Sequence, residues 1–119
     1  MIGKYHQGLT LEKWASYGTD GMIGNIGSDI SRAISARAKN DELHYRASVN
    51  RAIELIEMTA EVLRKSATPW RAKEMECLRE LVLGVEDSSM IDPDGLEYAD
   101  NYCMEFALRA QKTFIANHS

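Results

Sequence analysis

The chain has 119 residues, a formal net charge of −4 and an isoelectric point near 5.3. Charged residues make up 27% and hydrophobic residues 45% of it, proportions typical of one globular domain and not of a disordered chain. The acidic balance argues against nucleic-acid binding, and no apolar run reaches the roughly 20 residues of a membrane-spanning helix. The first residues lack the apolar region of a signal peptide, so we expect a cytoplasmic protein.

The first part of the chain predicts a short helix followed by a long one. Thr10 is suited to cap a short helix over residues 11–17, which Gly18 would end. Asp20 is suited to cap a second helix that runs to about residue 39. The apolar residues of this second helix recur at helical spacing and are Ile23, Ile26, Ile30, Ala33 and Ile34.

Residues 41–66 form the central predicted helix, which carries two apolar stripes. The segment contains neither proline nor glycine. One stripe consists of Tyr45, Val49, Ala52, Ile53, Ile56, Ala60 and Leu63. The second lies about a quarter-turn away and consists of Leu55, Met58 and Val62, with His44 beside them. Because an ordinary surface helix buries one stripe, two stripes indicate a helix with two neighbours.

Two pairs of a capping residue and a proline mark the remaining helices. Thr68-Pro69 opens a fourth helix that ends near Gly84, and Asp92-Pro93 opens the last one after a polar loop over residues 86–91. The inward residues of the fourth helix are Met75, Leu78, Leu81, Val82 and Val85. Those of the last helix are Leu96, Ala99, Tyr102, Cys103, Phe106, Ala110 and Phe114. A second stripe on the last helix consists of Met104, Leu108 and Ile115.

Together these elements predict an all-α fold, an antiparallel up-and-down four-helix bundle with a short extra N-terminal helix. Residues 1–119 form a single domain. Within it, residues 1–19 make an N-terminal arm and the short helix, and residues 20–119 make the bundle. No sustained alternation of polar and apolar residues predicts a strand.

Glycines and cysteines in the helices are best explained by packing. Gly21, Gly24 and Gly27 do not fit a phosphate-binding loop. Gly24, Ser28, Ser31 and Ser35 share one narrow face of small residues, on which we expect another helix to pack closely. Cys77 and Cys103 each lie among apolar neighbours. We therefore predict two reduced core thiols and no disulfide.

The sequence predicts neither a metal ion nor a cofactor. Glu54, Glu57 and Glu61 line up on the central helix, but they share a polar face with arginines, which predicts a solvated surface. The chain has no Glu-x-x-His pair of the kind that a di-iron bundle uses, and no zinc-like spacing of His and Cys. For His44 we expect a partly buried, hydrogen-bonded side chain.

An enzymatic alternative rests on Arg37 and His44, which are separated by six residues. This spacing resembles the R-x(4–6)-H motif of the HEPN ribonucleases. The resemblance implies a small helical bundle whose active site forms across a dimer. Arg37 would then stabilise the transition state, and His44 would act as general acid or base in metal-independent RNA cleavage. So short a motif is unspecific, and the acidic charge of the chain argues against an RNA substrate.

Three segments resemble a family of small uncharacterised bacterial and archaeal helical proteins. Gly8-Leu-Thr-Leu-Glu-Lys-Trp14 matches an opening G-x-T-x-E-K-W. Ile26-Gly-Ser-Asp-Ile-Ser-Arg-Ala33 is similar to I-G-S-E-x-x-R-A, and Arg51-Ala-Ile-Glu-Leu-Ile-Glu-Met-Thr59 is similar to R-A-L-E-L-L-D-L-T. The resemblance implies no particular activity or ligand, but it implies that the N-terminal segment is ordered.

The two second stripes lead to the main functional hypothesis, a non-enzymatic protein that acts by association with itself or with another protein. The predicted interface consists of Leu55, Met58, Val62, Met104, Leu108 and Ile115. Alternatively, the short N-terminal helix covers one stripe within the monomer through Leu9, Leu11 and Trp14. A further alternative is a small-ligand pocket, whose lining rings would be Tyr45, Trp70 and Tyr102. On sequence alone these alternatives stay open.

Overall fold

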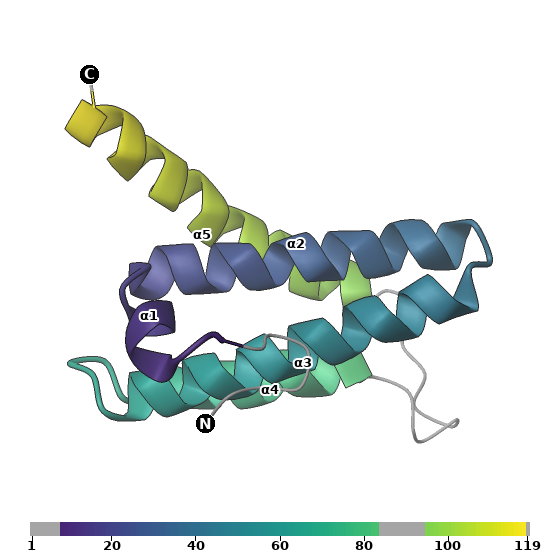
Figure 1. Cartoon of the computed structure of the whole chain (residues 1–119), viewed down its shortest axis with the longest axis horizontal. Coiled ribbons are helices and arrows are strands. Elements are labelled where there is room, and N and C mark those ends of the chain that lie inside the picture. Colours follow the sequence, from purple (N-terminus) through teal and green to yellow (C-terminus); the bar gives the residue numbers. More distant parts are fainter. Residues whose placement is uncertain (1–7, 84–94, 119) are drawn as a thin grey trace.

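The computed structural model describes residues 8–83 and 95–118, with the backbone alone at residues 114 and 116–118. All regular secondary structure in these ranges is helical (Figure 1). The helices are α1 (Leu11–Ala15), α2 (Gly18–Ala38), α3 (Glu42–Arg64), α4 (Arg71–Leu83) and α5 (Gly95–His118). The predicted end at Gly84, the inward Val85, the polar loop and the Asp92-Pro93 cap lie outside the described residues.

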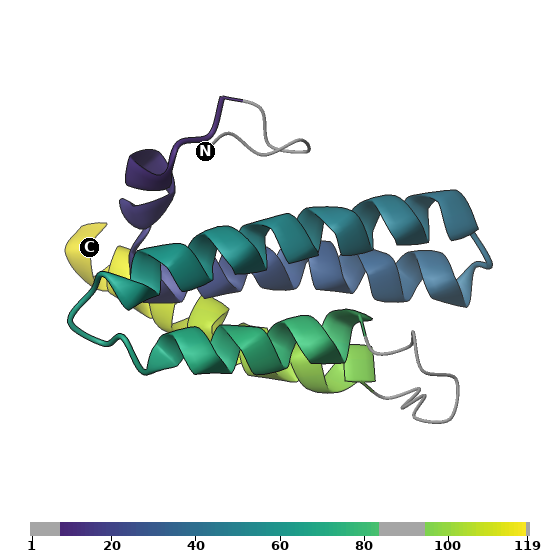
Figure 2. The same ribbon diagram turned by 90° about the horizontal axis from the view of Figure 1, so that it is seen from below.

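Four of these helices form the predicted bundle. Helices α2 and α3 make a long antiparallel hairpin, α4 packs against α3, and α5 packs against both α2 and α4 (Figures 1 and 2). Successive long helices run in opposite directions (Figure 2), which confirms the all-α up-and-down architecture. Helix α5 crosses α2 at an angle, and its C-terminal half extends away from the other helices (Figure 1).

The predicted apolar stripes build the core. Their buried members, each at most 5% exposed, are Ile23, Ile26, Ile30, Ala33, Ala52, Ile56, Ala60, Leu63, Met75, Leu78, Val82, Leu96, Ala99, Cys103 and Phe106. Ile34, Tyr45, Val49, Ile53, Leu81 and Tyr102 are partly buried against them. None of the helices in the described ranges combines the length and apolar character that crossing a membrane requires.

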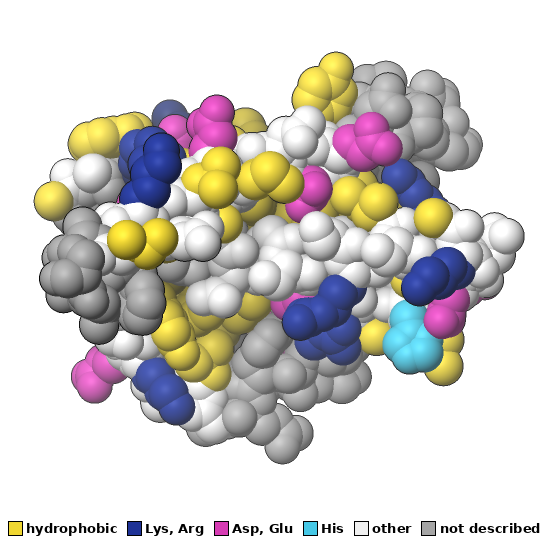
Figure 3. All heavy atoms as spheres, turned by 90° about the horizontal axis from the view of Figure 1, so that it is seen from above, with side chains coloured by type: hydrophobic (Ala, Val, Ile, Leu, Met, Phe, Trp, Pro, Cys, Tyr) yellow, Lys and Arg dark blue, Asp and Glu magenta, His cyan; other side chains and the backbone are white. Residues whose placement is uncertain are grey.

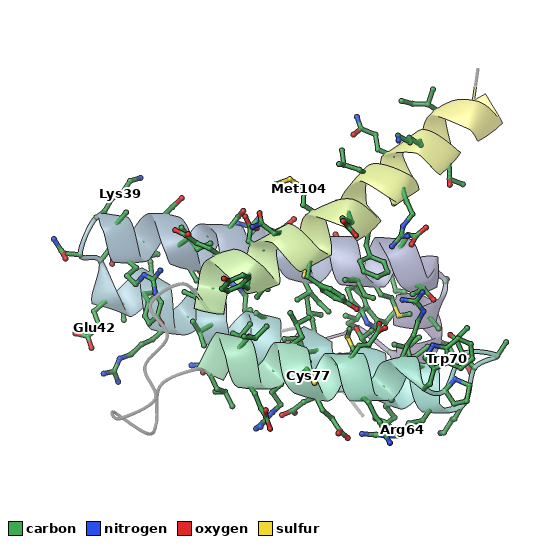
Figure 4. All side chains as sticks on the ribbon, turned by 180° about the vertical axis from the view of Figure 1, so that it is seen from behind. Lys39, Glu42, Arg64, Trp70, Cys77 and Met104 are labelled. Atoms are coloured by element: carbon green, nitrogen blue, oxygen red, sulfur yellow. The ribbon has the colours of Figure 1, made fainter. Side chains whose placement is uncertain are left out.

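The two cysteines occupy different environments. Cys103 is fully buried, and burial raises the pKa of its thiol to about 12, so this thiol stays protonated at neutral pH. Cys77 is exposed on the outer side of α4 (Figure 4). The prediction of a core thiol is therefore wrong for Cys77, because the buried face of α4 passes through Met75 and Leu78 on either side of it.

The capping hydrogen bonds of α1 and α3 are formed by side chains, and the first confirms the predicted cap at Thr10. The backbone N–H of Lys13 donates to Thr10 Oγ1 over 3.1 Å at the start of α1. At the start of α3, the backbone N–H of His44 donates to Asp41 Oδ1 over 3.2 Å. This hydrogen bond, together with one from the His44 side chain, holds the pKa of Asp41 below its usual value.

Two helix starts differ from the prediction. Helix α2 begins at Gly18, two residues before the expected cap at Asp20, because Gly18 adopts a φ of +73° and turns the chain directly from α1 into α2. Asp20 lies in the first turn of α2 and pairs instead with Arg109 of α5 over 3.5 Å. Helix α4 begins two residues after Pro69, because the chain first makes a turn there.

Glycines bring α2 and α5 into close contact, as predicted for Gly24 and, beyond the prediction, at Gly27. A Cβ atom added at Gly27 would lie 2.8 Å from Cys103 Cβ, and one added at Gly24 would lie 3.0 Å from Ala107 Cα. Such distances leave no room for a side chain at either position. The two helix backbones can therefore approach only because these α2 positions are glycine.

Helix α1 is fixed to α3 by a buried hydrogen bond. The Nε1–H group of Trp14 donates to Thr59 Oγ1 over 2.9 Å, and the Thr59 hydroxyl donates in turn to the Leu55 carbonyl over 2.7 Å. Trp14 is 3% exposed and Thr59 is fully buried. The hydroxyl thus satisfies an indole donor that has no access to water.

We expect Gly27→Ala to destabilise the protein. Replacing glycine by alanine inside a helix normally stabilises it by about 0.5–1 kcal/mol. Here the added methyl overlaps the Cys103 side chain, and overpacking costs about 1–3 kcal/mol. Urea unfolding should show a net loss of roughly 1 kcal/mol. Ser35→Ala, at an exposed position on the same helix, is the control and should leave stability unchanged or slightly raised. A Gly27→Ala protein as stable as wild type would contradict the close packing.

We also expect Thr59→Val to lower the free energy of unfolding by about 1–3 kcal/mol, because the Trp14 indole N–H then stays buried without an acceptor. Valine has nearly the same shape as threonine, so the change isolates the hydroxyl. Thr59→Ser keeps the hydroxyl and is the matched control. Urea unfolding measures stability, and the indole N–H resonance of Trp14 reports the bond itself. An unchanged resonance in Thr59→Val would contradict the assignment.

Candidate functional site

The predicted interface residues of α3 are covered within the monomer. Leu55 and Met58 are 4% and 7% exposed, and Val62 is partly buried. Trp14 of α1 belongs to the same buried cluster, and Leu9 and Leu11 pack against it. The structure therefore agrees with the alternative in which the short N-terminal helix covers one of the two stripes within the monomer. Leu55 and Met58 therefore present little surface to a partner.

The predicted interface residues of α5 are, by contrast, at the surface. Met104, Leu108 and Ile115 are 51%, 50% and 56% exposed. They lie on the helix whose C-terminal half extends away from the bundle (Figure 1), and Met104 borders the groove where α5 crosses α2. Viewed from above, hydrophobic side chains lie at the surface of the face toward which α5 rises (Figure 3). Half of the predicted interface is thus open to a partner.

Arg37 and His44 lie at the end of the α2–α3 hairpin, in the last turn of α2 and the first turn of α3. The expectation of a partly buried His44 is wrong, because its side chain is 73% exposed. Its hydrogen bonding is as expected, since His44 Nδ1 lies 2.5 Å from Asp41 Oδ2. The structure places both residues at one end of the bundle, and their role in RNA cleavage stays a prediction.

The three aromatic rings do not line one pocket. Tyr45 lies in the first turn of α3, whereas Trp70 follows the other end of that helix, roughly 30 Å away. Figure 4 shows Trp70 beside Arg64 and far from Glu42. Trp70 is also 61% exposed. The predicted aromatic pocket is therefore wrong.

A polar network joins α4 to α5 around Tyr102. The Tyr102 hydroxyl donates to Glu74 Oε2 over 2.8 Å, and Arg71 Nη1 donates to the same oxygen over 3.2 Å. Burial and the bond to Glu74 raise the pKa of the Tyr102 hydroxyl. The Arg71 guanidinium lies over the Phe106 ring at 5.5 Å. Each group has a structural partner, so the network ties the two helices together.

A buried charged cluster between α2 and α3 was not predicted. Asp29 is only 4% exposed and accepts hydrogen bonds from two arginines, Arg32 Nη1 at 3.0 Å and Arg51 Nε at 3.3 Å. Arg51 Nη2 also donates to Ser48 Oγ, over 3.1 Å, and Ser48 is 2% exposed. A carboxylate buried this deeply needs such partners, because an unpaired buried charge is strongly unfavourable.

The sequence contained a signal for this cluster. Asp29 follows Ile26 by three residues and precedes Ala33 by four, so it falls within the apolar stripe of α2. Thr59 follows Leu55 by four residues on α3 and falls on the inward side in the same way. A polar residue inside an apolar stripe indicates a buried, satisfied polar group.

A pocket of about 360 Å³ lies beside this cluster, between α1, α2 and α3. Its lining includes Leu9, Trp14, Tyr17, Asp29, Arg32 and Arg51. Within it the three segments of the family resemblance meet, the first through Trp14, the second through Asp29 and Arg32, and the third through Arg51. The pocket thus combines an apolar, partly aromatic wall with two cationic groups.

Among the described residues, no group of three or more His, Cys, Asp or Glu side chains is arranged to hold a metal ion. Glu57 pairs with Arg79 of α4 over 3.1 Å on the polar face of α3.

Comparison of the chain with protein-family models, with curated proteins and with solved structures finds no match. The candidate sites are therefore judged on their geometry, which offers an exposed apolar face on α5 and a cationic pocket beside α1.

Proposed function

We propose that this protein acts by association, and that its first partner is a second copy of itself bound along α5. The observation that carries the proposal is the exposure of Met104, Leu108 and Ile115 on a helix that extends beyond its own bundle. Apolar side chains that follow one another along a helix at spacings of four and seven form a continuous strip. Such a strip is typical of a helix that packs against another helix.

The extending half of α5 also needs a partner for its own stability. Isolated helices shorter than about 12–15 residues are marginal in water. Helix α5 packs on the bundle through Leu96, Ala99, Cys103 and Phe106, all of which are buried. Beyond them, the side chains that the structure describes are largely exposed. Pairing with a second helix would supply the apolar burial that the bundle does not provide there.

Charge complementarity favours an antiparallel second copy. Met104, Leu108, Gln111 and Ile115 are spaced like the core positions of a short coiled coil, with Glu105 and Lys112 at equivalent flanking positions. In an antiparallel pair of helices, the same flanking position of each helix faces its counterpart on the other helix. Glu105 of each subunit therefore lies opposite Lys112 of the partner subunit, and symmetry gives two such pairs. A parallel pair brings the flanking position 112 against the small, uncharged Ala107. The charges therefore support the antiparallel arrangement.

The same arrangement gives no support to the ribonuclease hypothesis. Lys39, at the end of the hairpin that carries Arg37 and His44, lies at the opposite end of the molecule from the extending half of α5 (Figure 4). In an antiparallel α5 pair the two hairpin ends point away from each other. An active site formed by Arg37 and His44 across this dimer is therefore not expected.

Solution mass tests the proposal. Light scattering on a sizing column should give a mass that approaches twice 13.4 kDa as the concentration rises from low to high micromolar. Leu108→Glu should weaken the dimer at least about tenfold, because it removes apolar burial twice by symmetry. The matched control is Leu43→Glu, at a leucine that is 78% exposed on the hairpin end. A wild-type protein that stays monomeric throughout would overturn self-association.

Charge reversal tests the antiparallel register separately. Glu105→Lys and Lys112→Glu should each weaken the dimer several-fold, since an exposed pair contributes about 0.2–1 kcal/mol and occurs twice. The double variant restores opposite charges and should recover most of the wild-type dissociation constant. Sedimentation at low salt is the suitable measurement, because salt screens such pairs. If the double variant is weaker than either single one, the antiparallel register is wrong.

A further inference from the structure

We propose that the pocket between α1, α2 and α3 binds a small organic anion, with its acidic group on Arg32 and Arg51 and its apolar body against Trp14 and Tyr17. The volume of about 360 Å³ suits a small molecule. No α5 residue was found in its lining within the described part of the chain, so the site is separate from the proposed dimer surface. The ligand class follows from the charge, the donors and the walls of the pocket.

The charges in the pocket do not balance. One carboxylate, Asp29, faces two guanidinium groups, so the cluster carries a net positive charge. Arg51 alone would pair Asp29, and it is 33% exposed, whereas Arg32 is 64% exposed. Arg32 lies three residues after Asp29 on α2, so it does not link α2 to α3, and most of its side chain is exposed. Its guanidinium therefore leaves a positive charge at the pocket that a negative group would pair.

The arginines are oriented to bind such a group. Asp29 and Ser48 hold Arg51 through two of its five N–H donors, and Asp29 holds Arg32 through one. Within the described chain, each guanidinium thus has further N–H groups for an incoming oxygen acid. The planar arrangement of these donors suits carboxylate and phosphate oxygens. Asp29 acts here as a positioning residue.

The opposite wall of the pocket is apolar and aromatic. The Trp14 ring is held in place by its bond to Thr59, and Tyr17 meets it edge-on at 5.6 Å. Tyr17 is 51% exposed, so a ligand can cover part of its ring.

A second pocket, of about 330 Å³ between α3 and α4, is lined by Glu54, Glu57, Glu61 and Glu76 as well as arginines. Its four carboxylates outnumber its two arginines, so this second pocket would repel an anion, unlike the pocket beside Asp29.

Tryptophan fluorescence can test the site directly. The chain has two tryptophans, so a Trp70→Phe background leaves Trp14 as the reporter. Phenyl phosphate and benzoate should each change its emission saturably, in roughly the millimolar range, with sodium chloride at equal ionic strength as the blank. Stronger binding of phenyl phosphate would assign a phosphate ester, and stronger binding of benzoate a carboxylate. Inorganic phosphate, which has no apolar body, should bind at least several-fold more weakly than phenyl phosphate.

Variants separate a ligand site from a structural cluster. Arg32→Gln should weaken binding of the better probe roughly tenfold while Arg51 still pairs Asp29. Arg46→Gln is the matched control, because Arg46 is an equally exposed arginine paired with Glu42 elsewhere on α3. Tyr17→Ala should weaken phenyl phosphate but not inorganic phosphate. The proposal is overturned if neither aromatic probe gives a saturable change, or if Arg32→Gln binds like wild type.

Discussion

The hydrogen bond between the Trp14 indole and the Thr59 hydroxyl is the interaction that holds α1 in place, and the pocket beside α1 depends on it. It fixes a helix of only five residues on α3, and such a helix has almost no stability of its own. With α1 in place, Leu55 and Met58 are covered and α3 loses its second apolar face. The same contact builds the aromatic wall of the pocket. This buried hydroxyl therefore helps to keep the α3 stripe covered and to form the pocket beside α1.

The direction of α5 follows from small residues at its crossing with α2. Gly24 and Gly27 let the backbones meet at Ala107 and Cys103, so the closest contact is confined to about one turn of each helix. Helices that cross at an angle separate again beyond the crossing point. Arg109 still reaches Asp20, and beyond it residues 111–113 and 115 are exposed. The departure of α5 from α2 thus exposes the far end of the strip at Ile115, whereas Met104 lies beside the crossing itself.

Helical periodicity was sufficient to predict the fold because each long helix has at least one complete apolar stripe. It also predicted the close packing at Gly24, because small residues repeated along one helix face allow another helix to approach, but it did not place Gly27 in that contact. Periodicity identifies which residues share a face, but it does not identify the neighbour that covers the face. The stripes through Leu55 and Leu108 looked equivalent for that reason, although α1 covers only the first. The charged cluster at Asp29 needed a different rule, because a carboxylate within an apolar stripe is stable only when it is paired, here with Arg32 of the same helix and Arg51 of α3.

Helix α2 lies between the two proposed sites, and its two faces serve them separately. Arg32 and Asp29 face the pocket, whereas Gly24 and Gly27 face α5. Coupling between the sites would require α2 to adopt a second position when the pocket is filled. The contact at Gly27 opposes this, because a backbone packed against Cys103 without an intervening side chain cannot shift toward it. A filled pocket would stabilise the docked α1 by mass action while leaving the α5 surface unchanged. Ligand binding and self-association are therefore expected to be energetically independent, even though the same helix supports both.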